Sequence, residues 1–342
     1  MKLLNIAIGL VLFALISCKE DKPSEPLNIG SKRIFVINEG NFQRANASLS
    51  VLNKETHATN HDVFKTINNR MLGDVFQSMA KYKDYLYLVV NNSGNIEVIN
   101  QNDLKSVTTF TNLVSPRYLC FYQDKAFISD LYSNQVSVLQ AKTGVLLKTI
   151  ACKGWTEQMI LTHFNEIAVT NPFARALYFI NPELEVITDS VNIGYGSVSL
   201  VQDRDSILWV STRALASESL VPRLYQIDSE KKLVLKYFDL PYEASRLTLN
   251  NTKDTLYFLM NNALYRHPIS KGILDVKVPL FNAAHNLYGL GIDPETGYIY
   301  LTDAKDFNQK GEILVLTHEK DGSLKSIAAV KAGFIPSSFY FD

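Results

Sequence analysis

This sequence of 342 residues is poor in cysteine, in net charge and in the short motifs of common catalytic sites. Its three cysteines are Cys18, Cys120 and Cys152. Small secreted scaffolds depend on many disulfides, whereas a chain of this length can bury a core without them. Cys18 lies apart, near the N-terminus, and we expect Cys120 and Cys152 to be buried free thiols.

An excess of charge of one sign is also missing. Lysine and arginine together number 34, and aspartate and glutamate together number 34, so the net charge is zero. A protein without a basic excess lacks the electrostatic attraction that nucleic-acid binding requires. The composition therefore predicts no nucleic-acid partner.

Recognisable catalytic and metal-binding motifs are absent as well. The six histidines form no HxH or HExxH pattern, and the sequence has no GxSxG elbow and no phosphate-binding loop. Two carboxylates, Asp74 and Glu157, lie alone near predicted strand starts, which is weak support for acid–base catalysis. We predict no catalytic residue, no metal site and no cofactor, and a hydrolase is the enzymatic alternative.

A long apolar run occurs at the N-terminus. Lys2 precedes an apolar stretch from Leu3 to Ile16, and Lys19 ends the stretch after Cys18. A membrane-spanning helix needs about 20 apolar residues, so the charge and the length are those of a signal peptide. An uncleaved anchor is the alternative.

The end of this run, Leu15-Ile16-Ser17-Cys18, resembles the lipobox of bacterial lipoproteins. The resemblance implies that Cys18 is acylated and attaches the protein to outer-membrane lipid. The tract Lys19-Glu20-Asp21 is similar to the signal that exports some Gram-negative lipoproteins to the cell surface. We therefore expect a signal peptide over residues 1–17, an acylated cysteine and flexible tether over 18–30, and one folded domain over 31–342.

The rest of the chain consists of short apolar runs separated by turns rich in Asn, Asp, Gly and Ser, which predicts strands. No window longer than about ten residues keeps a helical period. The runs recur in groups of four at a spacing of roughly 40 to 50 residues, the range of propeller blades. One group has a weak fourth run, near Ile273 to Val276. The six groups begin near Gln77, Arg117, Gln158, Ser197, Arg246 and Leu287.

The two ends of the chain complete a seventh group. The runs from Arg33 and Ser48 match a second and a third strand without a first, and Ser337 to Phe341 matches a first strand with no group after it. If this last strand pairs with the N-terminal segment, every group has four strands. The sequence thus predicts an all-β, seven-bladed β-propeller of four antiparallel strands per blade, closed by the C-terminal strand.

One face of such a ring carries the longer loops. Residues 38–47, 211–222 and 303–311 connect second to third strands, on the same face as the links between blades. Binding residues usually lie on loops held by a rigid scaffold, and this face is rich in aromatic, amide and arginine side chains. Amides are also common turn residues, which is the alternative for Asn91. The candidate ligand-binding residues are Phe42, Arg44, Gln77, Asn91, Arg117, Tyr118, Tyr132, Trp155, Phe173, Arg246 and Tyr288.

The body of the chain resembles the YncE-like propeller lipoproteins that have been described as surface-layer or cell-surface proteins. The strings that carry the resemblance are INEGNFQRANASLS from Ile37, LGDVFQSM from Leu72, VVNNS from Val89, SPRY from Ser115, TEQM from Thr156, DTLYFL from Asp254, YGLGIDPETGYIYLTDA from Tyr288 and GFIPSSFYF from Gly333.

Within that group, the resemblance extends to the BtuG type, which captures cobalamin and related corrinoids and caps a TonB-dependent outer-membrane transporter. The resemblance implies a corrinoid ligand and such a transporter as partners. A corrin ring fringed with amide groups suits an aromatic and amide-rich face. The alternatives are an adhesion or surface-layer propeller that binds protein or glycan, and a scaffold that faces the periplasm.

Overall fold

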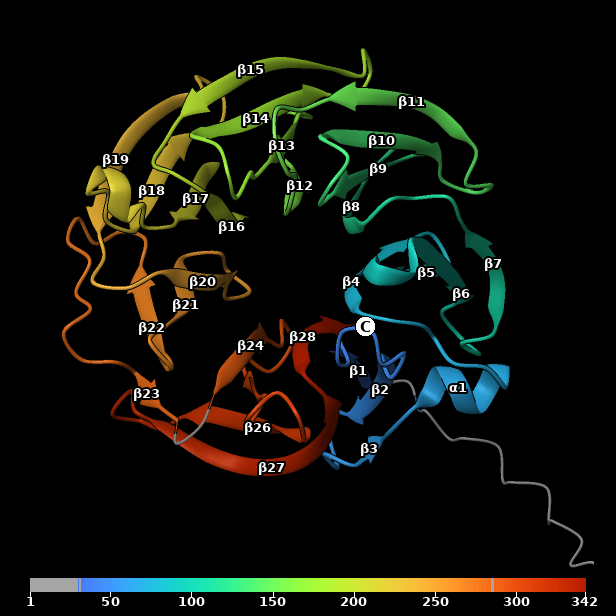
Figure 1. The fold of residues 1–342 in the computed structure, drawn as a ribbon. Coiled ribbons are helices and arrows are strands. Elements are labelled where there is room, and N and C mark those ends of the chain that lie inside the picture. The colour runs from blue at the N-terminus through green and yellow to red at the C-terminus, as the bar shows by residue number, and fades with distance from the viewer. Residues whose placement is uncertain (1–29, 31, 284–285) are drawn as a thin grey trace, which may run out of the picture.

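The computed structural model describes residue 30 and residues 32–283 and 286–342. These residues form seven four-stranded antiparallel sheets arranged around a central axis (Figure 1). The predicted seven-bladed β-propeller is confirmed. The predicted signal peptide, Cys18 and all of the tether except Gly30 lie outside the described residues.

We number the blades 1 to 7 along the chain and give the strands of each from the axis outward. Blade 1 contains β28 (Pro336–Phe341), β1 (Arg33–Asn38), β2 (Ser48–Asn53) and β3 (Thr59–Asn60); blade 2, β4 (Phe76–Tyr82), β5 (Tyr85–Val90), β6 (Asn95–Asn100) and β7 (Ser106–Phe110). Blade 3 contains β8 (Pro116–Tyr122), β9 (Lys125–Asp130), β10 (Gln135–Gln140) and β11 (Leu146–Ala151); blade 4, β12 (Met159–Leu161), β13 (Ile167–Val169), β14 (Ala176–Asn181) and β15 (Val186–Asn192). Blade 5 contains β16 (Ser197–Gln202), β17 (Ile207–Thr212), β18 (Arg223–Asp228) and β19 (Leu233–Asp239); blade 6, β20 (Ala244–Leu249), β21 (Thr255–Met260), β22 (Ala263–Pro268) and β23 (Phe281–Asn282). Blade 7 contains β24 (Leu287–Ile292), β25 (Ile299–Asp303), β26 (Lys310–His318) and β27 (Leu324–Phe334).

The ring closes through β28, as predicted from the missing strand at each end. β28 pairs antiparallel with β1, with Val36 opposite Phe339. It also packs against β24 of blade 7, where a Cβ atom on Gly289 would lie 2.5 Å from the carbonyl oxygen of Ser337. The absence of a side chain at Gly289 therefore permits the close approach of the last two inner strands.

The hydrophobic core lies between neighbouring blades. In one cluster, Phe127 of β9 packs with Ile167 and Val169 of β13, so blades 3 and 4 share their buried surface. Cys120 and Cys152 belong to this cluster, and both are free and buried, as predicted. Burial raises the pKa of each thiol to about 12, so neither is a reactive thiolate at neutral pH.

The predicted fourth strand of blade 6 is wrong in position. The strand is β23, where Phe281 pairs with Leu264, and not the segment from Ile273 to Val276. Leu274 and Val276 pack against the core beside blade 6 but do not join its hydrogen-bonded sheet. Their apolar pattern therefore reflects burial and not a strand.

One short helix, α1 (Val63–Asn68), follows β3 and was not predicted. It buries Val63 and Phe64 against the cluster between blades 1 and 2. No helix in the described parts of the chain has the length and the hydropathy of a membrane span.

Candidate binding site at the axial cavity

A β-bulge recurs near the start of the inner strands. In β4, Phe76 and Ser78 pair with β5 while Gln77 between them is skipped, and β16 and β24 skip Val198 and Tyr288 in the same way. Corresponding irregularities occur in β8, β20 and β28. Since a bulge re-aims a side chain, this irregularity, which occurs in six of the seven blades, turns residues near these strand starts out of the regular hydrogen-bonded pairing.

Skipped residues of β4, β8, β16, β20 and β24 line a cavity of about 440 Å³ on the face of the long loops, which we call the axial cavity. Eight of the eleven candidate residues line it, namely Phe42, Gln77, Asn91, Arg117, Tyr118, Tyr132, Arg246 and Tyr288. The sequence-based placement of these eight on one face is thus correct. The other lining residues are Glu39, Gly40, Val75, Leu131, Glu157, Val198, Arg213 and Ile335.

Three non-glycine residues that line the axial cavity have a positive φ angle. These are Val75 at 62°, Arg246 at 54° and Ile335 at 51°. The left-handed conformation is unfavourable for β-branched residues such as Val75 and Ile335. Such backbone strain of about 1–3 kcal/mol per residue concentrates at ligand-binding and catalytic sites, which supports a functional role for this cavity.

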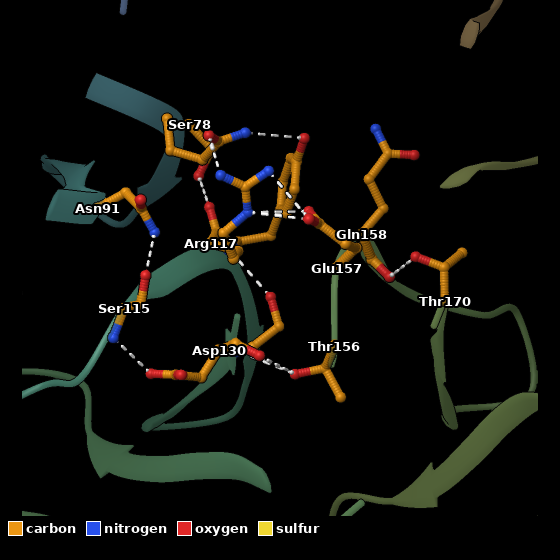
Figure 2. A network of polar contacts seen from close by, with 12 residues as sticks. Ser78, Asn91, Ser115, Arg117, Asp130, Thr156, Glu157, Gln158 and Thr170 are labelled. Carbon is orange, nitrogen blue, oxygen red and sulfur yellow. Dashed lines mark hydrogen bonds and ion pairs between the residues drawn. The ribbon is translucent and has the colours of Figure 1, made fainter. Parts of the chain in front are cut away.

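An arginine–carboxylate pair joins blades 3 and 4 at the cavity wall (Figure 2). The Nε atom of Arg117 donates to both carboxylate oxygens of Glu157 at 3.0 Å, and Nη2 lies 2.9 Å from Oε1. Nη1 of Arg117 donates to Oε1 of Gln77, and Nε2 of Gln77 donates to the hydroxyl of Tyr118 at 3.3 Å. Two carboxylate hydrogen bonds and one amide hydrogen bond therefore hold Arg117 in place.

The backbone around Glu157 is fixed by its neighbours. Oγ1 of Thr156 accepts the N–H of Asp130 at 2.8 Å, and the N–H of Glu157 donates to the carbonyl oxygen of Thr170 at 3.0 Å. Figure 2 shows Thr156 and Glu157 between the strands of blades 3 and 4. This arrangement places the carboxylate against Arg117 before any ligand arrives.

A second pair crosses from blade 6 to blade 1. Nη2 of Arg246 lies 3.7 Å from Oε1 of Glu39, and the hydroxyl of Tyr288 donates to Oε2 of Glu39 at 3.1 Å. The guanidinium of Arg246 also lies 5.0 Å from the centre of the Tyr288 ring. Burial raises the pKa of the Glu39 carboxyl above its ordinary value, and the charge of Arg246 opposes this shift.

Aromatic side chains extend from the rim of the cavity in a row that we call the aromatic ladder, formed by Tyr132, Trp155 and Phe173. The ring of Tyr132 packs edge-on against Trp155 at 5.3 Å, and Trp155 packs against Phe173 at 4.1 Å. Tyr132 is 60% exposed and Phe173 is 46% exposed. Exposed, mutually supported rings are a contact surface for a flat or apolar ligand.

The remaining candidates lie elsewhere. Trp155 and Phe173 do not line the cavity but belong to the aromatic ladder, whereas Arg44 belongs to neither and is exposed. Asn91 lines the cavity, but its amide nitrogen donates to Oγ of Ser115 and to the carbonyl oxygen of Pro116. Asn91 therefore has a structural role in holding the start of β8.

Three charged residues that line the axial cavity are not among the candidate binding residues predicted from the sequence, although Glu157 was noted there as a lone carboxylate near a strand start. Glu39 follows β1 within the loop that begins at residue 39, Glu157 precedes β12, and Arg213 follows β17. Each lies next to a strand end on the long-loop face, which is the signal that could have found them. Within the described residues, no group of three or more His, Cys, Asp or Glu side chains could hold a metal ion.

The whole ring corresponds to one known sequence family. Residues 32–342 match the family described as a domain of unknown function, DUF5074. The chain belongs to this family. Among curated proteins, none matches the DUF5074 chain.

Solved structures resemble the ring at low sequence identity. A quinonprotein alcohol dehydrogenase-like protein from Bacteroides thetaiotaomicron VPI-5482 has a TM-score of 0.71 at 12% identity, over 92% of this chain and 78% of that one. A protein from Lactobacillus plantarum has a TM-score of 0.71 at 14% identity, over 91% and 99%. Dihydro-heme d1 dehydrogenase NirN has a TM-score of 0.59 at 12% identity, over 94% and 76%.

Likeness at these identities shows the fold alone. The neighbours include proteins named as enzymes and one described only as a protein from Lactobacillus plantarum, so their names do not decide whether the DUF5074 chain is catalytic. The finer resemblance to YncE-like lipoproteins and to the BtuG type stays a prediction.

Proposed function

We propose that this DUF5074 protein captures a small-molecule ligand at the axial cavity and the aromatic ladder without transforming it. The observation that carries the proposal is the combination of a preformed cavity of about 440 Å³ with exposed rings at its rim. Ligand sites are concave, largely preformed and typically of 300–1,000 Å³, with a few fixed polar groups among apolar ones.

The paired charges favour binding over catalysis. A general acid or base needs a titratable group free to exchange a proton with substrate, and Glu157 is held by three contacts from Arg117. Rigid, mutually satisfied polar groups instead orient a ligand at low entropic cost, because little reorganisation accompanies binding.

The ligand that we propose is a corrinoid. A corrinoid is larger than the cavity, so its macrocycle would lie against the aromatic ladder while amide arms enter the cavity. There, the carboxamide of Gln77 and the hydroxyls of Tyr118 and Tyr288 offer hydrogen-bonding groups to such arms.

Titration calorimetry of the protein lacking residues 1–26 with cyanocobalamin tests this ligand. Removal of these residues leaves the whole ring intact. We expect heat of binding with a Kd of about 1 µM or tighter. The absence of heat at micromolar protein contradicts the corrinoid proposal. The alternative is then that the protein binds another protein or a glycan, because exposed aromatic side chains such as Phe42 and Tyr132 also suit such partners.

We also propose that an acylated Cys18 tethers the ring to the outer membrane on the cell surface, beside a TonB-dependent transporter. A tether raises the effective concentration of the ring near its partner. Metabolic labelling with an alkyne fatty acid should mark the wild-type protein and not Cys18→Ala. Protease added to intact cells should cleave the wild-type protein, whereas protection from protease contradicts surface exposure.

A further inference from the structure

The charged residues of the axial cavity do not balance. Five charged side chains line it: Glu39, Arg117, Glu157, Arg213 and Arg246. Glu157 pairs with Arg117 and Glu39 pairs with Arg246. Three arginines therefore face two carboxylates, and Arg213 is the positive charge left over.

The guanidinium of Arg213 has no hydrogen bond and no ion pair within the described residues. The guanidinium instead faces the ring of Phe173, whose centre lies 5.8 Å from the guanidinium carbon. The nearby carboxylate of Glu243 accepts the backbone N–H of Ala214 at 3.2 Å and forms no ion pair with Arg213. Arg213 is thus a half-buried cation at the junction of the cavity and the aromatic ladder.

The backbone of Arg213 is nevertheless held in place. Its N–H donates to the carbonyl oxygens of Tyr195 at 2.9 Å and Gly196 at 3.1 Å, in the link between blades 4 and 5. A Cβ atom on Gly196 would lie 3.3 Å from Cβ and Cδ of Arg213. The backbone of Arg213 is therefore fixed, while the N–H groups of its guanidinium have no acceptor among the described residues. A guanidinium can bind a carboxylate or a phosphate through two parallel hydrogen bonds.

We propose that Arg213 binds an anionic oxygen group, a phosphate ester or a carboxylate, carried by a ligand whose flat apolar part rests on the aromatic ladder. The proposal rests on the function proposed for the axial cavity, and it does not depend on the ligand being a corrinoid. Partial burial strengthens the attraction between Arg213 and the anion, because water screens the charges less than at an open surface.

Fluorescence of Trp155 provides the test. The protein has two tryptophans, and Trp209 is fully buried, so changes on addition of small ligands report on Trp155 in the ladder. Phenyl phosphate and benzoate are the anionic probes, and phenol is the neutral probe of the same ring. We expect both anions to bind more tightly than phenol, and the stronger of the two identifies the preferred anionic group.

Arg213→Gln should weaken the stronger anion about 10-fold, the usual loss for one charged hydrogen-bonding partner, and leave phenol within about twofold. Arg175→Gln is the matched control, because Arg175 lies on the same face, pairs with Glu218 and does not line the axial cavity. It should leave all three affinities unchanged. Urea unfolding should show Arg213→Gln to be as stable as the wild-type protein.

Three outcomes overturn the proposal. The first is equal affinity for phenol and the anions, and the second is no fluorescence response to either anion at about 10 mM, a generous limit for so small a ligand. The third is an anion affinity of Arg213→Gln equal to that of the wild-type protein. Cyanocobalamin, which carries one phosphodiester, separates the two proposals. Anion binding that depends on Arg213 without cyanocobalamin binding defeats only the corrinoid. Cyanocobalamin binding together with an anion affinity that Arg213→Gln leaves unchanged defeats only the anion site.

Discussion

The two ends of the ring axis are formed by the same inner strands but differ in chemistry. At the long-loop end, bulged strand starts present paired charges such as Arg117 and Glu157 to the axial cavity. At the opposite end, a hollow of about 360 Å³ is lined largely by apolar side chains, among them Leu249, Ile292 and Phe341.

This difference shows how one strand serves two purposes. In β4, the bulge leaves Gln77 out of the hydrogen-bonded pairing with β5, whereas this pairing is regular from Ser78 to Tyr82. Regular pairing sets alternate side chains into the cores between blades, while the bulge removes one residue from that alternation. We infer that the regular end stabilises the ring and the bulged end serves binding.

The largest effect is expected at the long-loop end. Glu157→Gln removes the carboxylate that pairs with Arg117. Both side chains are largely buried, Glu157 being 12% and Arg117 19% exposed, so the guanidinium is left as an unpaired charge with little access to water. We expect the free energy of unfolding to fall by about 3 kcal/mol, measured by urea denaturation at pH 7. The double variant with Arg117→Gln should recover more than half of the loss.

The control for this variant is Glu55→Gln, at a surface ion pair with Lys32 in which both side chains are about 60% exposed. Its effect should stay below about 0.5 kcal/mol. A loss from Glu157→Gln no greater than that of the control would mean that water, and not burial, sets the strength of the cavity pair.

The opposite end should respond in stability alone. Phe341 packs at 5.6 Å from the ring of Tyr300 and 6.2 Å from that of Phe339, but is itself partly exposed. Phe341→Ala should lower the free energy of unfolding by about 2 kcal/mol, less than for a fully buried ring. Ligand affinity, measured by calorimetry, should not change. A parallel loss of affinity would contradict the separation of the two ends.

The aromatic ladder should respond in the reverse manner. Tyr132→Ala removes an exposed ring that supports Trp155 and should weaken ligand binding about 10-fold, or about 1.4 kcal/mol. Its stability should change by about 0.5 kcal/mol or less. Tyr242→Ala, at another exposed tyrosine that does not line the cavity, is the control and should leave affinity unchanged. Equal losses in both variants would place the ligand elsewhere on the face.

The smallest effect is expected in the pH dependence of stability. Burial raises the pKa of Glu39 in the folded protein above its unfolded value, so ionisation is disfavoured in the folded state. The stabilising contribution of the protonated carboxyl is therefore complete at acidic pH and is lost as the pH rises through the folded-state pKa.

Glu39→Gln removes this titration. The stability of the wild-type protein relative to Glu39→Gln should fall as the pH increases from about 4 to 7, measured by urea denaturation at each pH. A relative stability that rises over this interval would show that the ion pair with Arg246 outweighs the burial of Glu39.

Much of the fold could be predicted because the strands and their repeat follow from the local alternation and spacing of apolar residues. Runs of four strands recur along the chain, and the strand missing before Arg33 is supplied by the strand from Pro336. The placement of Gln77, Arg117, Arg246 and Tyr288 on one face followed from their equivalent positions in the repeat. A segment that packs against the core without pairing as a strand, such as the one around Leu274, has the same apolar pattern as a strand. The fourth strand of blade 6 was therefore predicted at the wrong position.

The sequence by itself determined the number of blades, the closure of the ring and the face that carries the long loops. These depend on alternation and spacing, which are properties of adjacent residues. Only the tertiary structure decided which charges neutralise each other. Glu39 and Arg246 meet because closure brings blades 1 and 6 to the same axial cavity, and Arg213 is left unpaired because no carboxylate of the described residues lies within ion-pair distance of it. Such distances between remote segments are set by the curvature of the whole ring.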